Sequence, residues 1–314
     1  MRIVFAGTPD LAAPSLTALA DAGHEIVGVI TRADAPVGRK RVLTPSPVAE
    51  LAEHLGIPVH RSNRLDDETV AWVRDLAPDL GVIVAYGGLL REPLLSAPAQ
   101  GWINLHFSDL PRWRGAAPVQ RALMAGERRL GVSVFRLVEA LDAGDVLARD
   151  DEDFPPGTSA GEALSALAVS GAQTLVRAVA GLADGSLTGE PQSGEATHAA
   201  KLSRIDGRLD LTRSVDAVLA QWAGVTPEPG AYVECDGQPL KLHEIRTVEG
   251  TPGPPDPASG NGSDTAVMAV IAGKRALLRL SDGALELVRV QPAGKGAMDG
   301  AAWLRGRGGS AVIS

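Results

Sequence analysis

The fold is decided by the run Leu-Gly-Val-Ile-Val-Ala at residues 80–85, which is apolar from end to end. A strand of this composition is typically covered on both faces, as in the parallel sheets of α/β proteins. Similar short runs occupy residues 2–6, 25–30, 57–60 and 102–106. Helical patterns separate them, at residues 10–22, 46–55 and 66–76. The alternation predicts a doubly wound α/β domain with a parallel-type sheet, whose ligands lie where the carboxyl ends of the strands open into loops.

The second half of the chain has a different pattern. A long helix is expected over residues 159–183, followed by a polar stretch over 184–198. After a helix at 214–222, short strands are expected at residues 231–235, 240–248, 267–271, 276–280 and 284–290. Such a series of strands predicts a smaller OB-like β-barrel. The expected boundaries are a first domain over 1–188, a linker over 189–205 and the barrel over 206–314, with a mobile Pro- and Gly-rich surface loop at 250–264.

Composition excludes several classes of protein. The chain has 314 residues, of which 45% are hydrophobic, so two domains can each bury a core. The net charge of −8 means that any nucleic-acid binding must come from local basic patches. The single cysteine, Cys235, allows no intramolecular disulfide and no cysteine zinc cluster, and we expect it to pack inside a strand. No signal peptide or apolar run of about 18 residues is recognisable, so we expect a cytoplasmic protein without membrane contact.

Three polar side chains form the candidate catalytic constellation. Asn104 and His106 are two residues apart at the end of an expected strand, so both side chains project from one face. An amide and an imidazole there can donate hydrogen bonds to a carbonyl oxygen that becomes an oxyanion. Asp142, in Leu-Asp-Ala-Gly-Asp at 141–145, can orient His106, raise its pKa or relay a proton. Each of these residues alone more often has a structural role; the combination points to catalysis.

The segment Asn-Leu-His-Phe-Ser-Asp-Leu-Pro-Arg-Trp-Arg-Gly-Ala-Ala-Pro at 104–118 resembles the signature of the folate-dependent formyltransferases. Further similar segments follow in order over nearly the full length, at residues 5–10, 38–47, 84–87, 141–145, 200–203, 206–208 and 290–295. Within this family the chain is most similar to the members that formylate methionyl-tRNA. The resemblance implies a Rossmann-like formyltransferase domain, an OB-like tRNA-binding domain, and formyl transfer from 10-formyltetrahydrofolate to the amino group of methionyl-initiator tRNA for translation initiation.

The resemblance also implies roles for particular residues. Asn104, His106 and Asp142 match the family's catalytic triplet. The folate-binding positions would be Tyr86, Gly87, Gly88, Leu89, Leu90, Ser108, Asp109, Leu110 and Pro111. Two of these depart from the family's pattern: Asp109 replaces an apolar residue, and Gly88 replaces a larger one. No metal is implied, and we expect a monomer.

Basic residues mark the expected tRNA contacts. Arg39, Lys40 and Arg41 lie in the loop after the second expected strand, on the edge that carries the site. A flexible basic loop there can contact the acceptor end of a polyanion. Further candidates in and after the linker are Lys201, Arg275 and Lys295. Residues 267–314 contain seven Lys or Arg against three Asp or Glu, which favours a basic strip on the barrel.

Three other functions remain open at this stage. Formyl transfer to an amino-sugar nucleotide or a purine precursor would use the same three residues, but the basic loop argues against it. A nicotinamide-dependent dehydrogenase is disfavoured because the first turn, at residues 7–13, lacks the G-x-G-x-x-G pattern. A non-catalytic RNA-binding protein would leave the spacing of Asn104, His106 and Asp142 unexplained.

Overall fold

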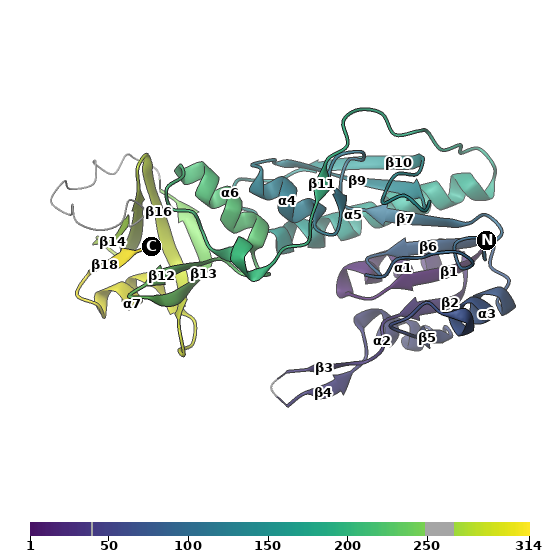
Figure 1. Ribbon diagram of the computed structural model, residues 1–314, viewed down its shortest axis with the longest axis horizontal. Coiled ribbons are helices and arrows are strands. Elements are labelled where there is room, and N and C mark those ends of the chain that lie inside the picture. The colour runs from purple at the N-terminus through teal and green to yellow at the C-terminus, as the bar shows by residue number, and fades with distance from the viewer. Residues whose placement is uncertain (39, 249–266) are drawn as a thin grey trace. The chain divides into compact units, whose positions relative to one another are not determined.

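The computed structural model describes residues 1–38, 40–248 and 267–314 (Figure 1). They divide into two units. Unit 1 consists of Met1–Pro118, Leu130–Glu152 and Leu164–Ala199, and unit 2 consists of Val119–Arg129, Asp153–Ala163 and Ala200–Ser314. Arg39 and the loop expected at 250–264 lie outside the described residues.

A mixed sheet forms the centre of unit 1, with the strand order β10-β9-β7-β6-β1-β2-β5. Its strands are β1 (Arg2–Gly7), β2 (Glu25–Thr31), β5 (Val59–Arg61), β6 (Leu80–Val84), β7 (Trp102–His106), β9 (Arg129–Arg136) and β10 (Val146–Asp153). The strands from β7 to β5 in this order pair in parallel, which confirms the doubly wound architecture. β9 runs antiparallel to β7, with Ser133 opposite His106. An apolar run carries no information about strand direction, so this pairing was not predicted.

The helices of unit 1 are α1 (Ala13–Asp21), α2 (Pro47–His54), α3 (Asp67–Asp75) and α5 (Ala160–Ala183), the last of which begins in unit 2. α2 and α3 confirm the helices expected at 46–55 and 66–76. The Ser46 side chain accepts a hydrogen bond from the backbone N of Ala49 at 3.1 Å, and Asp66 accepts one from Thr69 at 3.2 Å. These caps satisfy amides that have no partner inside the helix, which explains where each helix starts.

Two short strand pairs were not predicted. β3 (Ala35–Val37) and β4 (Val42–Thr44) form an antiparallel ribbon inside the expected basic loop, and Figure 1 shows it projecting from unit 1. β8 (Arg114–Gly115) pairs in parallel with β11 (His198–Ala199). Pairs this short depend on the surrounding chain and have no alternating pattern long enough to detect.

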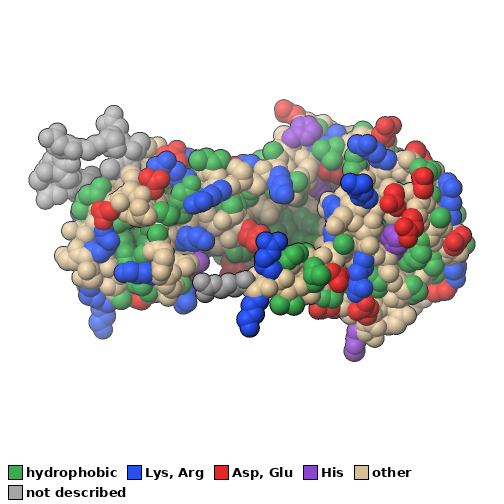
Figure 2. Space-filling model, turned by 60° about the horizontal axis from the view of Figure 1, so that its bottom comes forward, with side chains coloured by type: hydrophobic (Ala, Val, Ile, Leu, Met, Phe, Trp, Pro, Cys, Tyr) green, Lys and Arg blue, Asp and Glu red, His purple; other side chains and the backbone are tan. Residues whose placement is uncertain are grey.

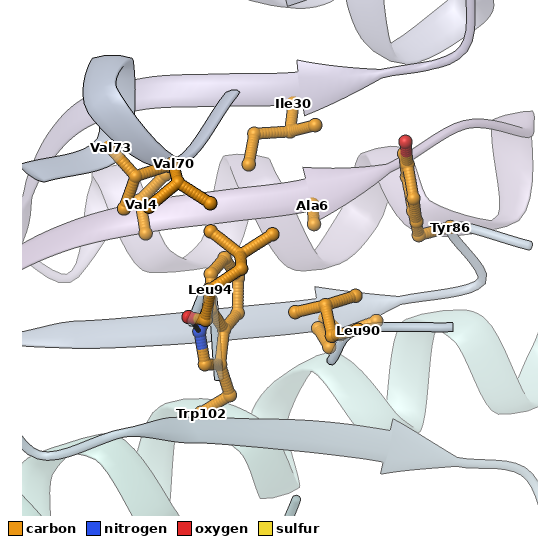
Figure 3. Packing of buried hydrophobic residues seen from close by; sticks show 10 residues of the cluster. Val4, Ala6, Ile30, Val70, Val73, Tyr86, Leu90, Leu94 and Trp102 are labelled. Atoms are coloured by element: carbon orange, nitrogen blue, oxygen red, sulfur yellow. Dashed lines mark hydrogen bonds between the residues drawn. The ribbon is translucent and has the colours of Figure 1, made fainter. Parts of the chain in front are cut away.

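A hydrophobic cluster on one face of the sheet packs α3 and the chain after β6 against β1, β2 and β7 (Figure 3). Its buried members are Val4, Ala6, Ile30, Val70, Val73, Ile83, Tyr86, Leu90, Leu94 and Trp102. The indole N of Trp102 donates to the carbonyl oxygen of Leu94 at 2.8 Å, so this buried donor is satisfied. Trp102, Asn104 and His106 are every second residue of β7, so their side chains project from the same face of the sheet. The candidate catalytic side chains therefore lie on the face that the cluster covers.

Helix α5 is long and apolar enough to cross a membrane by length and composition, so the expectation that no segment approaches such a length was wrong here. Half of its most apolar window is buried inside the protein. At Gly171 the helix lies close to the sheet, where an added Cβ would be 3.3 Å from Leu105 and 3.4 Å from Val132. This contact is typical of a helix that covers a sheet in a domain core.

Unit 2 contains a closed barrel in which, among the described strands, six follow the order β13-β12-β18-β14-β15-β16 and β13 pairs with β16. They are β12 (Tyr232–Cys235), β13 (Gln238–Thr247), β14 (Val267–Ala272), β15 (Arg275–Leu280), β16 (Gly283–Pro292) and β18 (Ser310–Ile313), with β17 (Met298–Asp299) appended to β16. The OB-like barrel is therefore confirmed. The sequence showed five of these strands and missed β18, which is short and half exposed.

Helices complete unit 2: α4 (Pro118–Met124), α6 (Val215–Val225) and α7 (Gly300–Arg305), together with a 3₁₀ turn at Arg204–Gly207. α6 confirms the helix expected at 214–222. Its Trp222 indole N donates to the carbonyl oxygen of Leu242 in β13 at 2.8 Å, which attaches the helix to the barrel. Cys235 is free and buried in β12, as expected.

Candidate active site

Strand β7 places Asn104 and His106 at the edge where the parallel strands end. His106 is only 6% exposed, whereas Asn104 is half-buried. Among the described residues, the amide group of Asn104 has no hydrogen-bond partner. A half-buried amide in this state has its donor and acceptor available for a substrate.

The imidazole of His106 is held on several sides. Its Nε2 lies 2.9 Å from the carbonyl oxygen of Trp113, and its ring meets that of Phe135 edge-on at 6.3 Å between centroids. A carbonyl oxygen only accepts hydrogen bonds, so Nε2 carries the proton in the neutral ring and Nδ1 keeps its lone pair. Nδ1 lies 4.0 Å from Oδ2 of Asp142. The structure thus brings together His106 and Asp142, which are far apart in sequence.

Asp142 occupies a tight turn between β9 and β10. Its φ is 47°, in the left-handed region that residues with a Cβ seldom adopt. Its Oδ2 accepts a hydrogen bond from the backbone N of Gly115 at 2.8 Å. In the same turn, a Cβ on Gly144 would overlap the backbone oxygen of Arg136, so only glycine fits. Gly144 therefore allows the tight turn that carries the Asp142 carboxylate to His106.

The pKa of His106 is lowered from its ordinary value. Burial is the main cause, because it penalises the charged ring, while the Asp142 carboxylate and the hydrogen bond to Trp113 act in the opposite direction. The expectation that Asp142 raises the pKa is right for its own contribution, but the net direction is downward. A neutral imidazole at neutral pH can accept a proton at Nδ1, and the neighbouring carboxylate then stabilises the imidazolium.

The segment expected to line the folate site has mostly buried side chains: Ser108, Leu110 and Pro111 are buried. The hydroxyl of Ser108 donates to the carbonyl oxygen of Arg112 at 2.6 Å. Asp109, in contrast, faces solvent, and its Oδ1 lies 3.2 Å from Nε of Arg149. Arg149 also donates to the carbonyl oxygen of Leu110 at 2.9 Å. The carboxylate at position 109 is thus accommodated at the surface by an arginine that the sequence did not single out.

The loop expected to contact the pteridine ring follows β6. Gly87, Gly88 and Leu89 are exposed, whereas Tyr86 and Leu90 are buried in the hydrophobic cluster. The Tyr86 hydroxyl donates to the carbonyl oxygen of Ser62 at 3.0 Å. An added Cβ at Gly88 would lie 2.7 Å from the Tyr86 ring, which accounts for the glycine there. The loop therefore offers backbone groups and one apolar side chain, Leu89, to a ligand.

The basic residues expected to contact tRNA are exposed wherever the structure describes them. Lys40 and Arg41 lie at the tip of the β3–β4 ribbon, while Arg39 lies outside the described residues. On unit 2 the exposed candidates are Lys201, Arg275 and Lys295. None of these five described cations has a carboxylate within ion-pair distance among the described residues. Among the charged side chains on the visible face of unit 2, Figure 2 shows Lys and Arg predominating over Asp and Glu.

Sequence reasoning missed the backbone groups that hold the site. The carbonyl oxygen of Trp113 and the amide of Gly115 are the partners of His106 and Asp142, and a backbone group leaves no residue-type signal. Gln192 was also missed, although its side chain contacts the Asp142 turn. It lies in a polar stretch whose composition indicated only a linker. In the described part of the chain no group of His, Cys, Asp or Glu is arranged to hold a metal ion.

The comparisons with known proteins cover both units. Residues 1–179 match the family model described as formyl transferase, and residues 201–308 match that of the formyl transferase C-terminal domain. The chain is 56% identical over 315 residues to a methionyl-tRNA formyltransferase of Leifsonia xyli subsp. xyli, and the match covers all of both chains.

Two solved structures share the fold at low identity. One is a sugar 3N-formyl transferase named WlaRD, solved in the presence of dTDP and 5-N-formyl-THF, with a TM-score of 0.66, 12% identity, and coverage of 94% of this chain and 98% of that one. The other is HypX from Aquifex aeolicus in complex with tetrahydrofolic acid, with a TM-score of 0.62, 19% identity, and coverage of 97% of this chain and 47% of that one.

Proposed function

The chain belongs to the formyl transferase family, and from this premise we propose that it transfers a formyl group from 10-formyltetrahydrofolate to the amino group of methionyl-initiator tRNA. The observation that carries the proposal is the 4.0 Å approach of Asp142 to a buried imidazole whose Nδ1 keeps its lone pair. Acyl transfer to an amine needs a group that accepts a proton, and His106 meets this requirement. The 56% identity over the whole chain supports methionyl-tRNA as the acceptor.

The residues act in one sequence of steps. The neutral amine of methionyl-tRNA attacks the formyl carbon, and the carbonyl oxygen becomes an oxyanion. Asn104 donates a hydrogen bond to this oxygen through its unpartnered amide. His106, which the sequence predicted as a second donor, already directs its Nε2–H to the carbonyl oxygen of Trp113. The proton of the attacking amine passes to Nδ1 of His106, and Asp142 stabilises the resulting imidazolium. Collapse of the intermediate breaks the bond from carbon to N10 of the folate, and the proton returns from His106 to that nitrogen.

The folate would be bound beside this centre by the loop 86–90 and the segment 108–111. The exposed backbone of Gly87 and Gly88 and the apolar side chain of Leu89 suit one face of a flat ring. The charged tail of a folate is anionic, and Arg149 lies beside the 108–111 segment, where it already contacts Asp109 and the carbonyl oxygen of Leu110. These features fit a folate as co-substrate and are independent of the acceptor.

The acceptor tRNA would be bound by the six basic residues that the sequence singled out, five of which the structure describes as exposed. Arg39, Lys40 and Arg41 belong to the basic loop, and Lys201, Arg275 and Lys295 to unit 2. Cations without carboxylate partners can release counterions from a phosphate backbone without first breaking an ion pair. We propose that residues 1–188 form the catalytic domain and 206–314 the tRNA-binding domain, joined by residues 189–205, of which those up to Ala199 belong to unit 1.

The decisive experiment is a formylation assay with the purified protein. Methionyl-tRNA, an amino-sugar nucleotide and glycinamide ribonucleotide are offered separately with 10-formyltetrahydrofolate. We expect transfer to methionyl-tRNA, little transfer to the other acceptors, and loss of transfer in His106→Ala with nearly unchanged tRNA affinity. Glu139→Gln, which changes an exposed carboxylate between β9 and Asp142, is the matched control and should behave as wild type. Preferred transfer to either small acceptor would refute the proposal.

A further inference from the structure

The segment of residues 190–199, which we call the strap, contacts two parts of the candidate active site. One is the chain after β7, at residues 113–117, and the other is the turn that carries Asp142. At its start, the backbone of Glu190 pairs with Val146 through hydrogen bonds of 2.8 and 2.9 Å. At its end, Ala199 accepts hydrogen bonds from the backbone N atoms of Ala116 at 2.9 Å and Ala117 at 3.2 Å. All of these residues belong to unit 1. The polar composition of the strap predicted a linker, yet its backbone is bonded to the chain after β7 and to the first residue of β10.

Gln192 joins the two loops through its side chain. Its Nε2 donates to the carbonyl oxygens of Asp142 at 2.8 Å and Gly144 at 2.9 Å. Its Oε1 accepts from the guanidinium of Arg114, with Nη2 at 2.6 Å and Nε at 3.2 Å. The NH₂ group of this half-buried amide therefore bonds the turn of Asp142, and its oxygen bonds Arg114, the residue after Trp113.

Thr197 holds the second loop. Its hydroxyl oxygen accepts a hydrogen bond from the backbone N of Trp113 at 2.9 Å, and its carbonyl oxygen accepts one from Arg114 at 2.8 Å. Trp113 is the residue whose carbonyl oxygen is the partner of His106 Nε2. The strap thus contacts the residue on each side of the imidazole.

Asp142 and Trp113, the two residues on either side of the imidazole, share an unusual backbone conformation. Asp142 has a φ of 47° and Trp113 a φ of 60°, both in the left-handed region. A residue with a Cβ is strained in this region and persists there only where the surroundings hold it. Gln192 bonds the backbone of one such residue and Thr197 the backbone of the other. Asp142 therefore accepts a hydrogen bond from the strap, and Trp113 donates one to it.

We propose that Gln192 and Thr197 are positioning residues, which hold Asp142 and Trp113 in the strained conformations that orient the imidazole of His106 for proton transfer. The inference rests on the proposed formyl transfer for its catalytic consequence, but the positioning itself is a property of the free protein. Neither residue needs to touch either substrate.

The test uses isosteric variants of the full-length protein. Gln192→Met keeps the length of the side chain and removes its polar atoms, and Thr197→Val keeps the shape and removes the hydroxyl. We expect each to lower kcat about tenfold or more, because Gln192→Met removes the hydrogen bonds to Asp142, Gly144 and Arg114, and Thr197→Val removes the one from the backbone N of Trp113. A tenfold loss of rate corresponds to about 1.4 kcal/mol. KM for methionyl-tRNA and for 10-formyltetrahydrofolate should change less than twofold.

Two controls separate positioning from general damage. Thr197→Ser restores the hydroxyl and should recover most of kcat. Ser193→Ala alters an exposed residue of the strap that makes no hydrogen bond among the described residues, and it should match wild type. Thermal unfolding of all variants verifies that the fold is retained; if Thr197→Val does not fold, Gln192→Met carries the test.

A readout without substrate distinguishes this inference from the proposed function. Titration of His106 by NMR in the free protein reports its surroundings, where the charged side chain facing it is Asp142 and the other described neighbours are the uncharged Phe135 ring and Trp113 carbonyl. Displacing Asp142 removes the contribution that raises the pKa of His106, so the pKa should fall in Gln192→Met and stay unchanged in Ser193→Ala. An unchanged titration together with wild-type kcat in Gln192→Met and Thr197→Val overturns the inference. Absence of formyl transfer by the wild-type protein overturns the proposed function instead.

Discussion

Replacement of Asp142 by Asn tests the central electrostatic contact of the site. The Asn side chain has nearly the same shape, and its carbonyl oxygen can still accept the hydrogen bond from the backbone N of Gly115. Only the negative charge that faces Nδ1 of His106 is lost. The two side chains are 8% and 11% exposed, so solvent screens their interaction only weakly.

The size of the effect follows from the distance. Two opposite unit charges 4.0 Å apart attract by about 4 kcal/mol at an effective dielectric constant of about 20. If between half and all of this attraction is present in the transition state, kcat falls about 30- to 1,000-fold, since each tenfold corresponds to about 1.4 kcal/mol. The free energy of unfolding should change by less than about 1 kcal/mol, because the hydrogen bond to Gly115 is kept.

The assay measures kcat for methionyl-tRNA formylation as a function of pH. A neutral His106 is the active form, so the rate falls as pH drops through the pKa of this histidine. Asp142 contributes to raising that pKa, and its loss moves the acid limb of the profile to lower pH. Glu139→Gln supplies the matched control, since its carboxylate is exposed on the chain that leads to the same turn. A kcat of Asp142→Asn within threefold of wild type, with the acid limb in place, would refute the assignment of Asp142 as the partner of the imidazolium.

Three further outcomes are expected. Asn104→Ala removes the oxyanion donor and should lower kcat about 100- to 1,000-fold with little change in KM; a change confined to KM in steady-state kinetics would contradict this role. His106 has a lowered pKa through burial, so the unfolded chain takes up its proton at higher pH than the folded one. The free energy of unfolding in urea should therefore decline as pH falls below about 6.5, and less steeply in His106→Gln; equal slopes would show that the buried histidine is not involved. Gly144→Ala must displace the turn that bears Asp142, so it should reduce activity strongly, whereas Gly296→Ala, in open space, should not; comparable activities would contradict the close approach at Gly144.

Apolar periodicity was sufficient to predict most elements of the fold. The strands at 80–85 and 102–106 and the capped helices at 46–55 and 66–76 are found within a residue or two, because local pattern and capping chemistry agree there with the tertiary structure. The direction of β9 and the strand β18 were beyond reach, because direction and edge pairing depend on contacts between distant segments. The β3–β4 ribbon was missed for the same reason: its Val37, Val42 and Leu43 are exposed and give no core pattern.

In the candidate site, too, some features could be predicted from the sequence and others are set only by the fold. Residue types and spacing were enough to single out Asn104, His106 and Asp142, and the alternation along β7 placed the first two on one face. The sign of the pKa shift of His106 was not accessible, because it is a balance between burial and the charge of Asp142, and burial is a property of the folded molecule. Asp109 was identified as a departure, but its partner Arg149 is forty residues away and only the fold brings them together.

The amino-acid sequence alone determined which chemical groups are present and which local elements carry them, since hydrophobic alternation, helix caps and glycine turns act over a few residues. Tertiary structure alone decided how these groups meet: a carboxylate from the turn at 142 and a carbonyl from residue 113 lie beside one imidazole, and the strap at 190–199 bonds both of those residues. Hydrogen bonds and charge interactions act over a few ångströms in space whatever the separation along the chain, so the state of His106 is set only when distant segments have folded against one another.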